Sequence, residues 1–238
     1  MFRNKGKRRT YIHNLRLASI LSFVAGIVNI SGVLSLNTLT TNVTGHFAFF
    51  SEMFINKNYK AAIVFISYIS CFLTGAFFSN FMVEMISRRK QNHSYATPII
   101  IETLIIFTAA FLPDIDKLYI LPYVLLFAMG LQNALVTKVS QSIVRTTHLT
   151  GLFTDLGIEL SQFIFSRTKE ERQQLLKNIS LKAAIITFFF IGGVFGGLIY
   201  MRYQLKTLLL ASLFLIVALF YDIILLKFYA LRKKITFK

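Results

Sequence analysis

Residues 129–160 read MGLQNALVTKVSQSIVRTTHLTGLFTDLGIEL. The stretch begins as an apolar helix containing the pair Gln132–Asn133, then breaks at a Ser/Thr-rich segment that carries Arg145. It restarts as a second helix that holds Asp155 and Glu159. Polar and charged side chains are costly inside an apolar environment, so this stretch is the first place to look for function.

The composition around this stretch is that of a membrane protein. Of the 238 residues, 55% are hydrophobic and only 15% are charged, the mean hydropathy is +0.62, and 25 residues are Phe. Soluble domains carry about 25% charged residues. We therefore expect an integral membrane protein with residues 1–238 forming a single membrane domain, and the lipid bilayer is its first partner.

The net charge of +16 does not indicate a nucleic-acid partner, because the basic residues lie in the connections between apolar runs. This distribution is the one that the positive-inside rule predicts for a membrane protein. The single cysteine, Cys71, excludes an internal disulfide and a cysteine-based metal site. The histidines show no metal-ligand spacing, and no nucleophile, base and orienting group stand in a catalytic pattern. We expect no metal, no cofactor and no enzymatic activity.

Apolar runs predict the helices that cross the bilayer, for which about 20 residues suffice. The predicted spans are 17–36, 61–85, 98–112, 118–136, 183–201 and 208–226, the first of them uncleaved. Two shorter apolar pieces lie at 46–55 and 151–165. Ten helical residues reach only about 15 Å, which is half a bilayer core. The hydrophilic segment 166–182 is expected to be a surface helix or loop.

An internal repeat relates the two halves of the chain. Three pairs of segments match in the same order: 26–29 with 130–133, 41–45 with 147–151, and 75–79 with 192–196. Repeat one spans about 15–112 and repeat two about 118–228. Each half reads as a long span, a broken segment with a short helix, and two further spans.

The fold class follows as an all-α polytopic membrane protein in one of two arrangements. Six spans with two short re-entrant half-helices make the repeats inverted, whereas eight spans make them parallel. With both termini inside, six spans place 21 of the 26 Lys and Arg inside, and eight spans place 19 there. The positive-inside rule and the short length of 46–55 favour six spans.

The two breaks, which are the interruptions at 41–45 and 147–151 before the short helices, are the predicted site. Thr44 and Thr150 are each expected to cap a short helix, whose N-terminus then attracts anions. Broken helices that meet near the midplane are typical of secondary transporters, although Thr-x-x-Thr-Gly also serves simply to end and restart a helix. The candidate substrate- or ion-binding residues are Asn29, Thr41, Thr44, Gly45, Asn133, Arg145, Thr147, His148, Thr150, Gly151, Asp155 and Glu159.

Asp155 and Glu159 share one helix face, because they are four residues apart. Two carboxylates cannot face lipid, so they face protein, water or a cation. One reading is a structural ion-pair cluster with Arg145 and His148; the other is a proton or cation site coupled to solute movement. The first half has Phe49 and Met53 at the aligned positions, so such a site is asymmetric.

The same stretch resembles the YoaK family of bacterial membrane proteins. The resemblance rests on Asn133, Arg145-Thr146-Thr147-His148, Thr150-Gly151 and Thr154-Asp155-Leu156-Gly157, and on Val43-Thr44-Gly45 in the first half. The family is defined by a domain of unknown function. The resemblance implies a multispan, usually six-span, inner-membrane protein and no settled activity. Leu39-Thr40-Thr41-Asn42 departs from the expected His-Met-Thr-Gly-Asn-like run.

The leading functional hypothesis is a transporter for a small solute. The residues at the breaks favour a solute with an anionic group, and transport that is coupled to a proton. The alternative is a non-transporting scaffold or partner-binding protein that uses segment 166–182. The expected location is the bacterial inner membrane, with both termini cytoplasmic. The sequence does not identify the substrate or the oligomeric state, and a homo-oligomer is one possibility.

Overall fold

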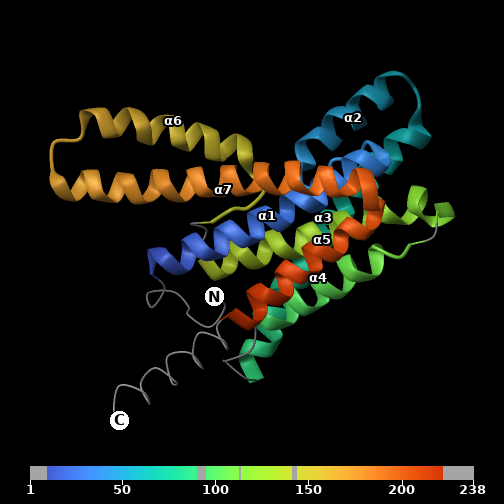
Figure 1. The fold of residues 1–238 in the computed structure, drawn as a ribbon. Coiled ribbons are helices and arrows are strands. Elements are labelled where there is room, and N and C mark those ends of the chain that lie inside the picture. Colours follow the sequence, from blue (N-terminus) through green and yellow to red (C-terminus); the bar gives the residue numbers. More distant parts are fainter. Residues whose placement is uncertain (1–9, 90–94, 113, 141–143, 222–238) are drawn as a thin grey trace, which may run out of the picture.

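The computed structural model describes residues 10–89, 95–112, 114–140 and 144–221. Within these ranges the chain is helical and has no strand. The helices are α1 (Tyr11–Leu36), α2 (Val43–Ile55), α3 (Tyr59–Arg89), α4 (Ala96–Ala109), α5 (Asp114–Ser140), α6 (Leu149–Phe165) and α7 (Lys169–Tyr203). A 3₁₀ turn, η2 (Gln204–Thr207), follows α7 and leads into the helical segment 208–221 (Figure 1).

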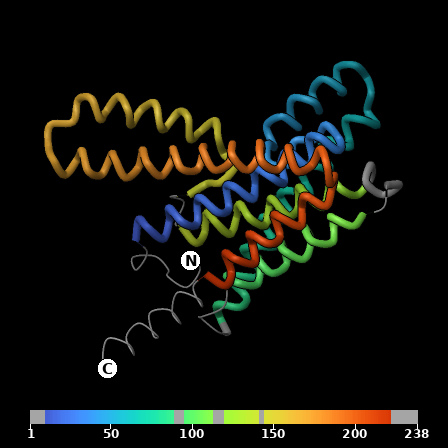
Figure 2. Tube along the Cα trace, in the orientation of Figure 1, coloured from blue at the N-terminus to red at the C-terminus, as the bar shows by residue number. Residues whose placement is uncertain are grey.

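Four stretches of the described chain are long and apolar enough to cross a membrane: Tyr11–Leu36, Tyr59–Arg88, Ile120–Ser140 and Lys169–Tyr221. The last of them holds both α7 and segment 208–221, and the chain reverses direction between the two at η2 (Figure 2). The 14-residue helix α4 is also apolar but shorter. The all-helical membrane class predicted from composition is therefore confirmed.

Segment 166–182 differs from the simplest expectation of a separate surface element. Helix α7 starts at Lys169 and continues through the apolar run without interruption for 35 residues. Its N-terminus is capped by Thr168, whose side chain accepts a hydrogen bond from the Glu171 N–H. At 1.5 Å per residue α7 is about 52 Å long, well beyond a hydrocarbon core of about 30 Å. With α6 beside it, its first half projects from the bundle (Figure 1).

The long helices pair across the chain. α1 packs against α7, and α3 packs against α5. Glycines allow both close crossings: Gly26 lies against the Phe189 carbonyl, and Gly130 lies against the Phe72 carbonyl. Small residues are the usual means by which membrane helices approach closely. The glycines of segment 192–197 on α7 face α1 in the same way.

The partners in each pair run in the same direction. Along α3 and α5, the contact of Ser67 with Tyr123 at 3.1 Å is followed by that of Glu84 with Lys138 at 2.8 Å. α1 and α5 run in opposite directions, as the ribbon shows (Figure 1). We call the end of the bundle at which α1 begins the amino end.

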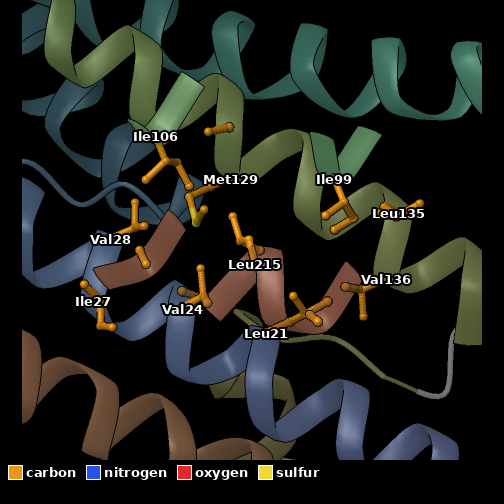
Figure 3. Packing of buried hydrophobic residues seen from close by; sticks show 14 of the residues in the cluster. Leu21, Val24, Ile27, Val28, Ile99, Ile106, Met129, Leu135, Val136 and Leu215 are labelled. Atoms are coloured by element: carbon orange, nitrogen blue, oxygen red, sulfur yellow. The ribbon is translucent and has the colours of Figure 1, made fainter. Parts of the chain in front are cut away.

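The hydrophobic core lies where α1, α4, α5 and segment 208–221 meet (Figure 3). It contains fully buried side chains from each of them, among them Leu21 and Val24 of α1, Ile106 of α4, Met129 of α5 and Leu215. The outward sides of α3 and α7 carry exposed large apolar residues instead, such as Phe77 and Leu198. Such surfaces match a lipid environment.

Candidate functional site

Both breaks fold back along the helix that precedes them. The Thr41 hydroxyl donates to Asn29 Oδ1 at 3.0 Å, and the Thr147 hydroxyl donates to Asn133 Oδ1 at 2.8 Å. α1 ends seven residues after Asn29, and α5 ends seven residues after Asn133. Each loop therefore returns from the end of its helix by about 10 Å along the helix axis. α2 and α6 therefore begin beside the middle of α1 and α5, not at their ends.

The caps of the two short helices are not the predicted threonines. The N-cap of α2 is Asn42, whose side chain accepts a hydrogen bond from the Gly45 N–H at 3.1 Å. The N-cap of α6 is His148, which makes no side-chain capping bond. Thr44 and Thr150 instead occupy the second helical position, because α2 and α6 start two residues earlier than a threonine cap requires. The first turn of α6 is thus left without a side-chain acceptor.

One cavity of about 800 Å³ lies between the two breaks. This volume falls within the range of small-molecule sites, roughly 300–1,000 Å³. Nine of the twelve predicted site residues line it: Asn29, Thr41, Thr44, Gly45, Asn133, Arg145, Thr147, His148 and Thr150. The tertiary structure thus gathers residues that lie as far apart as 29 and 150 in the chain.

The cavity lining consists largely of matched residues from the two halves. The matched pairs in the lining are Asn29 and Asn133, Thr41 and Thr147, Val43 and Leu149, Thr44 and Thr150, and Phe72 and Phe189. Two further positions differ in chemistry: Leu39 corresponds to Arg145, and Asn42 corresponds to His148. Arg145 supplies the permanent charge of the lining, which includes no carboxylate. The site is therefore positive on the side of the second half.

The other three predicted site residues do not line this cavity. Gly151 and Asp155 line a second cavity of about 340 Å³, which shares Arg145 and His148 with the first. A side chain at Gly151 would overlap the His148 ring, so this glycine allows the imidazole to lie between the two cavities. Asp155 is exposed to this second space.

Glu159 is held in an ion pair. Its carboxylate lies 2.6 Å from the Lys182 ammonium, and the two side chains are only 14% and 17% exposed. The partner is therefore a residue of α7, and not Arg145, which is nearer in sequence. Lys182 is separated from Glu159 by the α6–α7 turn, and only the antiparallel packing of these helices brings them together.

Other lining residues have weak sequence signals. Phe72 and Phe189 each stand three residues before the paired glycines Gly75 and Gly192, so alignment of the two halves could have found them. Thr137 follows Asn133 by one helical turn. Among the residues that the structure describes, no three His, Cys, Asp or Glu side chains lie together as metal ligands would.

Buried polar groups connect the core to the cavity. The Gln132 amide donates to the Leu21 carbonyl at 2.9 Å and to the Thr146 hydroxyl at 3.3 Å. Thr146 is fully buried, and its neighbours on both sides line the cavity. Glu102 of α4 is also fully buried, and neither of its oxygens has a hydrogen-bond partner in the described structure.

Known proteins agree with the membrane assignment. The chain is 25% identical over 187 residues to the UPF0700 transmembrane protein YoaK of Bacillus subtilis (strain 168), covering 76% of this chain and 82% of the relative. No solved structure matches it. The family model described as "Protein of unknown function (DUF1275)" matches residues 17–221, which include both breaks and every residue of the cavity. The chain is a membrane protein and belongs to the DUF1275 family.

Proposed function

We propose that the chain is a transporter for a small solute that carries an anionic group, with the 800 Å³ cavity as its binding site. The observation that carries the proposal is the meeting of two helix N-termini in a cavity lined by matched residues and one arginine. Helix N-termini present N–H donors and a partial positive charge, which favour anions. Arg145 adds a full positive charge on the same side as the uncapped end of α6.

The two halves form an inverted repeat in this proposal, with boundaries near 15–112 and 118–228. Three features support it: the antiparallel course of α1 and α5, the equivalent glycine crossings, and the equivalent Thr–Asn hydrogen bonds (Figure 1). Inverted repeats with discontinuous helices are a recurrent plan of secondary transporters. Exchange of the two halves between equivalent conformations would open the cavity to each side of the membrane in turn.

The same features favour six crossings with α2 and α6 re-entrant over eight crossings. Each short helix begins beside the middle of the preceding span and runs back toward the end from which its loop entered. Non-helical backbone at such depth is tolerated where it lines a watery cavity, as these breaks do. The contact of Arg16 with the Tyr221 ring, at 5.4 Å near the two ends of the described chain, fits six and eight crossings alike, because both numbers are even.

We place the protein in the bacterial inner membrane with its amino end in the cytoplasm. On the helix ends, the α6–α7 turn and the first half of α7, which lie at that end, the described Lys and Arg residues are Arg16, Arg88, Lys138, Arg167, Lys169, Arg172, Lys177 and Lys182. The α2–α3 turn, the start of α3 and the turn at η2 lie at the opposite end and carry Lys57, Lys60, Arg202 and Lys206. The excess at the amino end fits the positive-inside rule.

The transport proposal is tested first by binding. The purified protein is screened by thermal denaturation against monocarboxylates, dicarboxylates, phosphate and sulfate, and any stabilising anion is then followed as labelled solute in proteoliposomes. Arg145→Leu introduces the residue found at the corresponding position 39 of the first half, and it should abolish both stabilisation and uptake. Arg167→Leu is the matched control, because Arg167 is exposed on the α6–α7 turn.

Two results would reject the proposal. If no anion stabilises the protein, the cavity does not bind anionic solutes. If an anion is taken up equally by wild type and Arg145→Leu proteoliposomes, uptake does not pass through this cavity.

The topology is tested by chemical labelling from one side of the membrane. Single cysteines replace Arg88 and Asn56 in a Cys71→Ser background, because both positions are exposed and lie at opposite ends of α3. With six crossings, a membrane-impermeant maleimide reaches position 56 from outside and position 88 only from inside. Labelling of position 88 from outside would reject the inverted arrangement.

A scaffold function is the second candidate, and the projecting α6–α7 hairpin favours it (Figure 1). The exposed side chains of Glu170, Arg172 and Lys177 give this hairpin a polar surface. Affinity capture of the full-length protein should then yield one stoichiometric partner. Replacing these three residues with Gln should abolish that capture and leave solute binding unchanged.

A further inference from the structure

The second cavity, of about 340 Å³, is lined by the second break, the start of α6 and the facing part of α7, and these two helices lie side by side (Figure 1). Its volume is within the range of small-molecule sites, roughly 300–1,000 Å³. Arg145 and His148 line this cavity and the 800 Å³ cavity alike. The guanidinium that carries the anion site of the first cavity therefore belongs to the second cavity as well.

The second cavity differs from the first in its charges. Three formally charged residues line it, namely Arg145, Lys182 and Asp155. The Lys182 ammonium is neutralised by the Glu159 carboxylate at 2.6 Å. Arg145 and Asp155 form no ion pair or side-chain hydrogen bond with any residue that the structure describes, and so none with each other. One cation and one anion are thus left without partners in the lining of the same cavity.

These two opposite charges select the class of ligand. A simple anion would be attracted by Arg145 and repelled by Asp155, and a simple cation would meet the reverse. A zwitterion satisfies both, because its carboxylate matches the guanidinium and its ammonium group matches the Asp155 carboxylate. The Asn178 amide, which also lines the cavity, can hydrogen bond to either group.

The neighbouring carboxylate on α6 shows what a structural ion pair looks like in this protein. Glu159 lies one helical turn beyond Asp155, is 14% exposed and contacts Lys182. Asp155 is exposed, lines the cavity and has no such contact within the described chain. Of the two carboxylates on this helix face, one is committed to the packing of α6 against α7, and the other is available to a ligand.

We propose that the solute is a small zwitterion of the amino-acid type, whose anionic group binds at Arg145 and whose ammonium group binds at Asp155 in the second cavity. This inference rests on the proposed transport function, because it takes the anion site from that function and adds a site for the cationic group. Binding then depends on the presence of both charges and on the spacing between them.

The measurement is titration calorimetry of the purified protein with carbon-matched pairs of ligands. Each monocarboxylate from acetate to hexanoate is compared with the acid that carries an ammonium group at the far end of the same chain, from glycine to 6-aminohexanoate. Wild type should bind at least one amino acid about 10-fold tighter than its matched carboxylate, the effect of one hydrogen bond to a charged group. The chain length with the largest preference reports the spacing of the two charges.

Asp155→Asn should bring this preference close to one. It should weaken the binding of the amino acid and leave the binding of the matched carboxylate unchanged or tighter, because a repelling charge is gone. Asp155→Glu, which keeps the charge on a longer side chain, should retain the preference and move its maximum to a shorter amino acid. Glu52→Gln is the matched control, because Glu52 is exposed on α2 and lines neither cavity.

The results separate this proposal from the transport function. Equal affinities of wild type for both members of every pair overturn the zwitterion site and leave the anion site intact. A preference that persists in Asp155→Asn also overturns it, because the ammonium group then binds elsewhere. An absence of binding by both members of every pair rejects the anion site, and the zwitterion site with it.

A phospholipid with an ethanolamine headgroup presents the same two groups, a phosphate and an ammonium. This source is tested by melting the protein in nanodiscs of phosphatidylglycerol with and without phosphatidylethanolamine. Stabilisation by phosphatidylethanolamine that is lost in Asp155→Asn, without binding of any amino acid, would assign the cavity to a lipid headgroup and overturn the proposal of a zwitterionic solute. Equal melting temperatures in the two nanodiscs, with binding of an amino acid, are the expected result.

Discussion

The contact between α1 and α7 allows a sharp test, because two adjacent glycines differ in what surrounds them. A Cβ at Gly192 would overlap the Phe23 carbonyl oxygen and lie 2.9 Å from its carbonyl carbon, against at least 3.4 Å for ordinary contact. The helices would have to separate by at least about 0.5 Å to accommodate it. A Cβ at Gly193 would find its nearest neighbour, the Gly26 carbonyl oxygen, at 3.9 Å.

The expected effects of alanine at these two positions therefore have opposite signs. Overpacking costs about 1–3 kcal/mol, and the upper end applies at Gly192 because the neighbouring atoms are backbone. Alanine regains about 1 kcal/mol of helix propensity, which leaves Gly192→Ala less stable by about 1–2 kcal/mol. Gly193→Ala has no overpacking cost, so it should be more stable than wild type by the gain in helix propensity alone. For a chain of this size the net loss lowers the melting temperature by about 2–8 °C.

The measurement is thermal denaturation of the two variants and wild type, purified in the same detergent. Gly130→Ala provides a second copy of the experiment in the α3–α5 crossing, because its Cβ would overlap the Phe72 carbonyl oxygen. It should lose about as much stability as Gly192→Ala. A Gly192→Ala protein that melts at or above the temperature of Gly193→Ala would refute the close helix contact.

Three further predictions concern α6 and its surroundings. Lys182→Met leaves the Glu159 carboxylate partly buried and unpaired and should cost about 2–3 kcal/mol, most of which Glu159→Gln restores in a double-mutant cycle of melting temperatures. Thr147→Val removes the donor to Asn133 Oδ1 and should cost about 1–2 kcal/mol; an unchanged melting temperature would mean that the hydrogen bond does not hold the break. Gly157→Ala should stabilise the protein by about 0.5–1 kcal/mol, since no atom lies within 4 Å of the added Cβ, and a lower melting temperature would point to an unseen contact at this face.

Much of the site was predictable because the breaks are local features. A cluster of polar and β-branched residues next to a glycine interrupts an apolar helix locally, so residues near Thr41 and Thr147 could be found without knowing how the chain folds. The alignment of the two halves added Asn29 and Asn133. The caps were mispredicted because a threonine beside a glycine and a preceding Asn42 are equally suitable N-cap positions, and only the backbone course of each loop selects between them.

The ion pair of Glu159 and the burial of Glu102 could not be predicted in this way. Glu102 stands early in an apolar run, from which a side chain could reach the membrane interface, and it is buried only because α4 packs against the other helices. Lys182 belongs to a polar segment that gives no sign of contact with α6. Both contacts depend on which helices are neighbours.

The amino-acid sequence by itself determined that this is a membrane protein, where its apolar segments lie, and which residues stand at the two breaks. These properties depend on the length and polarity of single segments, which water and lipid select directly. Only the tertiary structure decided that α1 pairs with α7 and α3 with α5, and so that the two breaks enclose one cavity. In lipid every face of a span is apolar, so hydropathy does not mark the packing face. The choice falls to small residues such as Gly26 and Gly192, whose effect depends on the backbone that meets them.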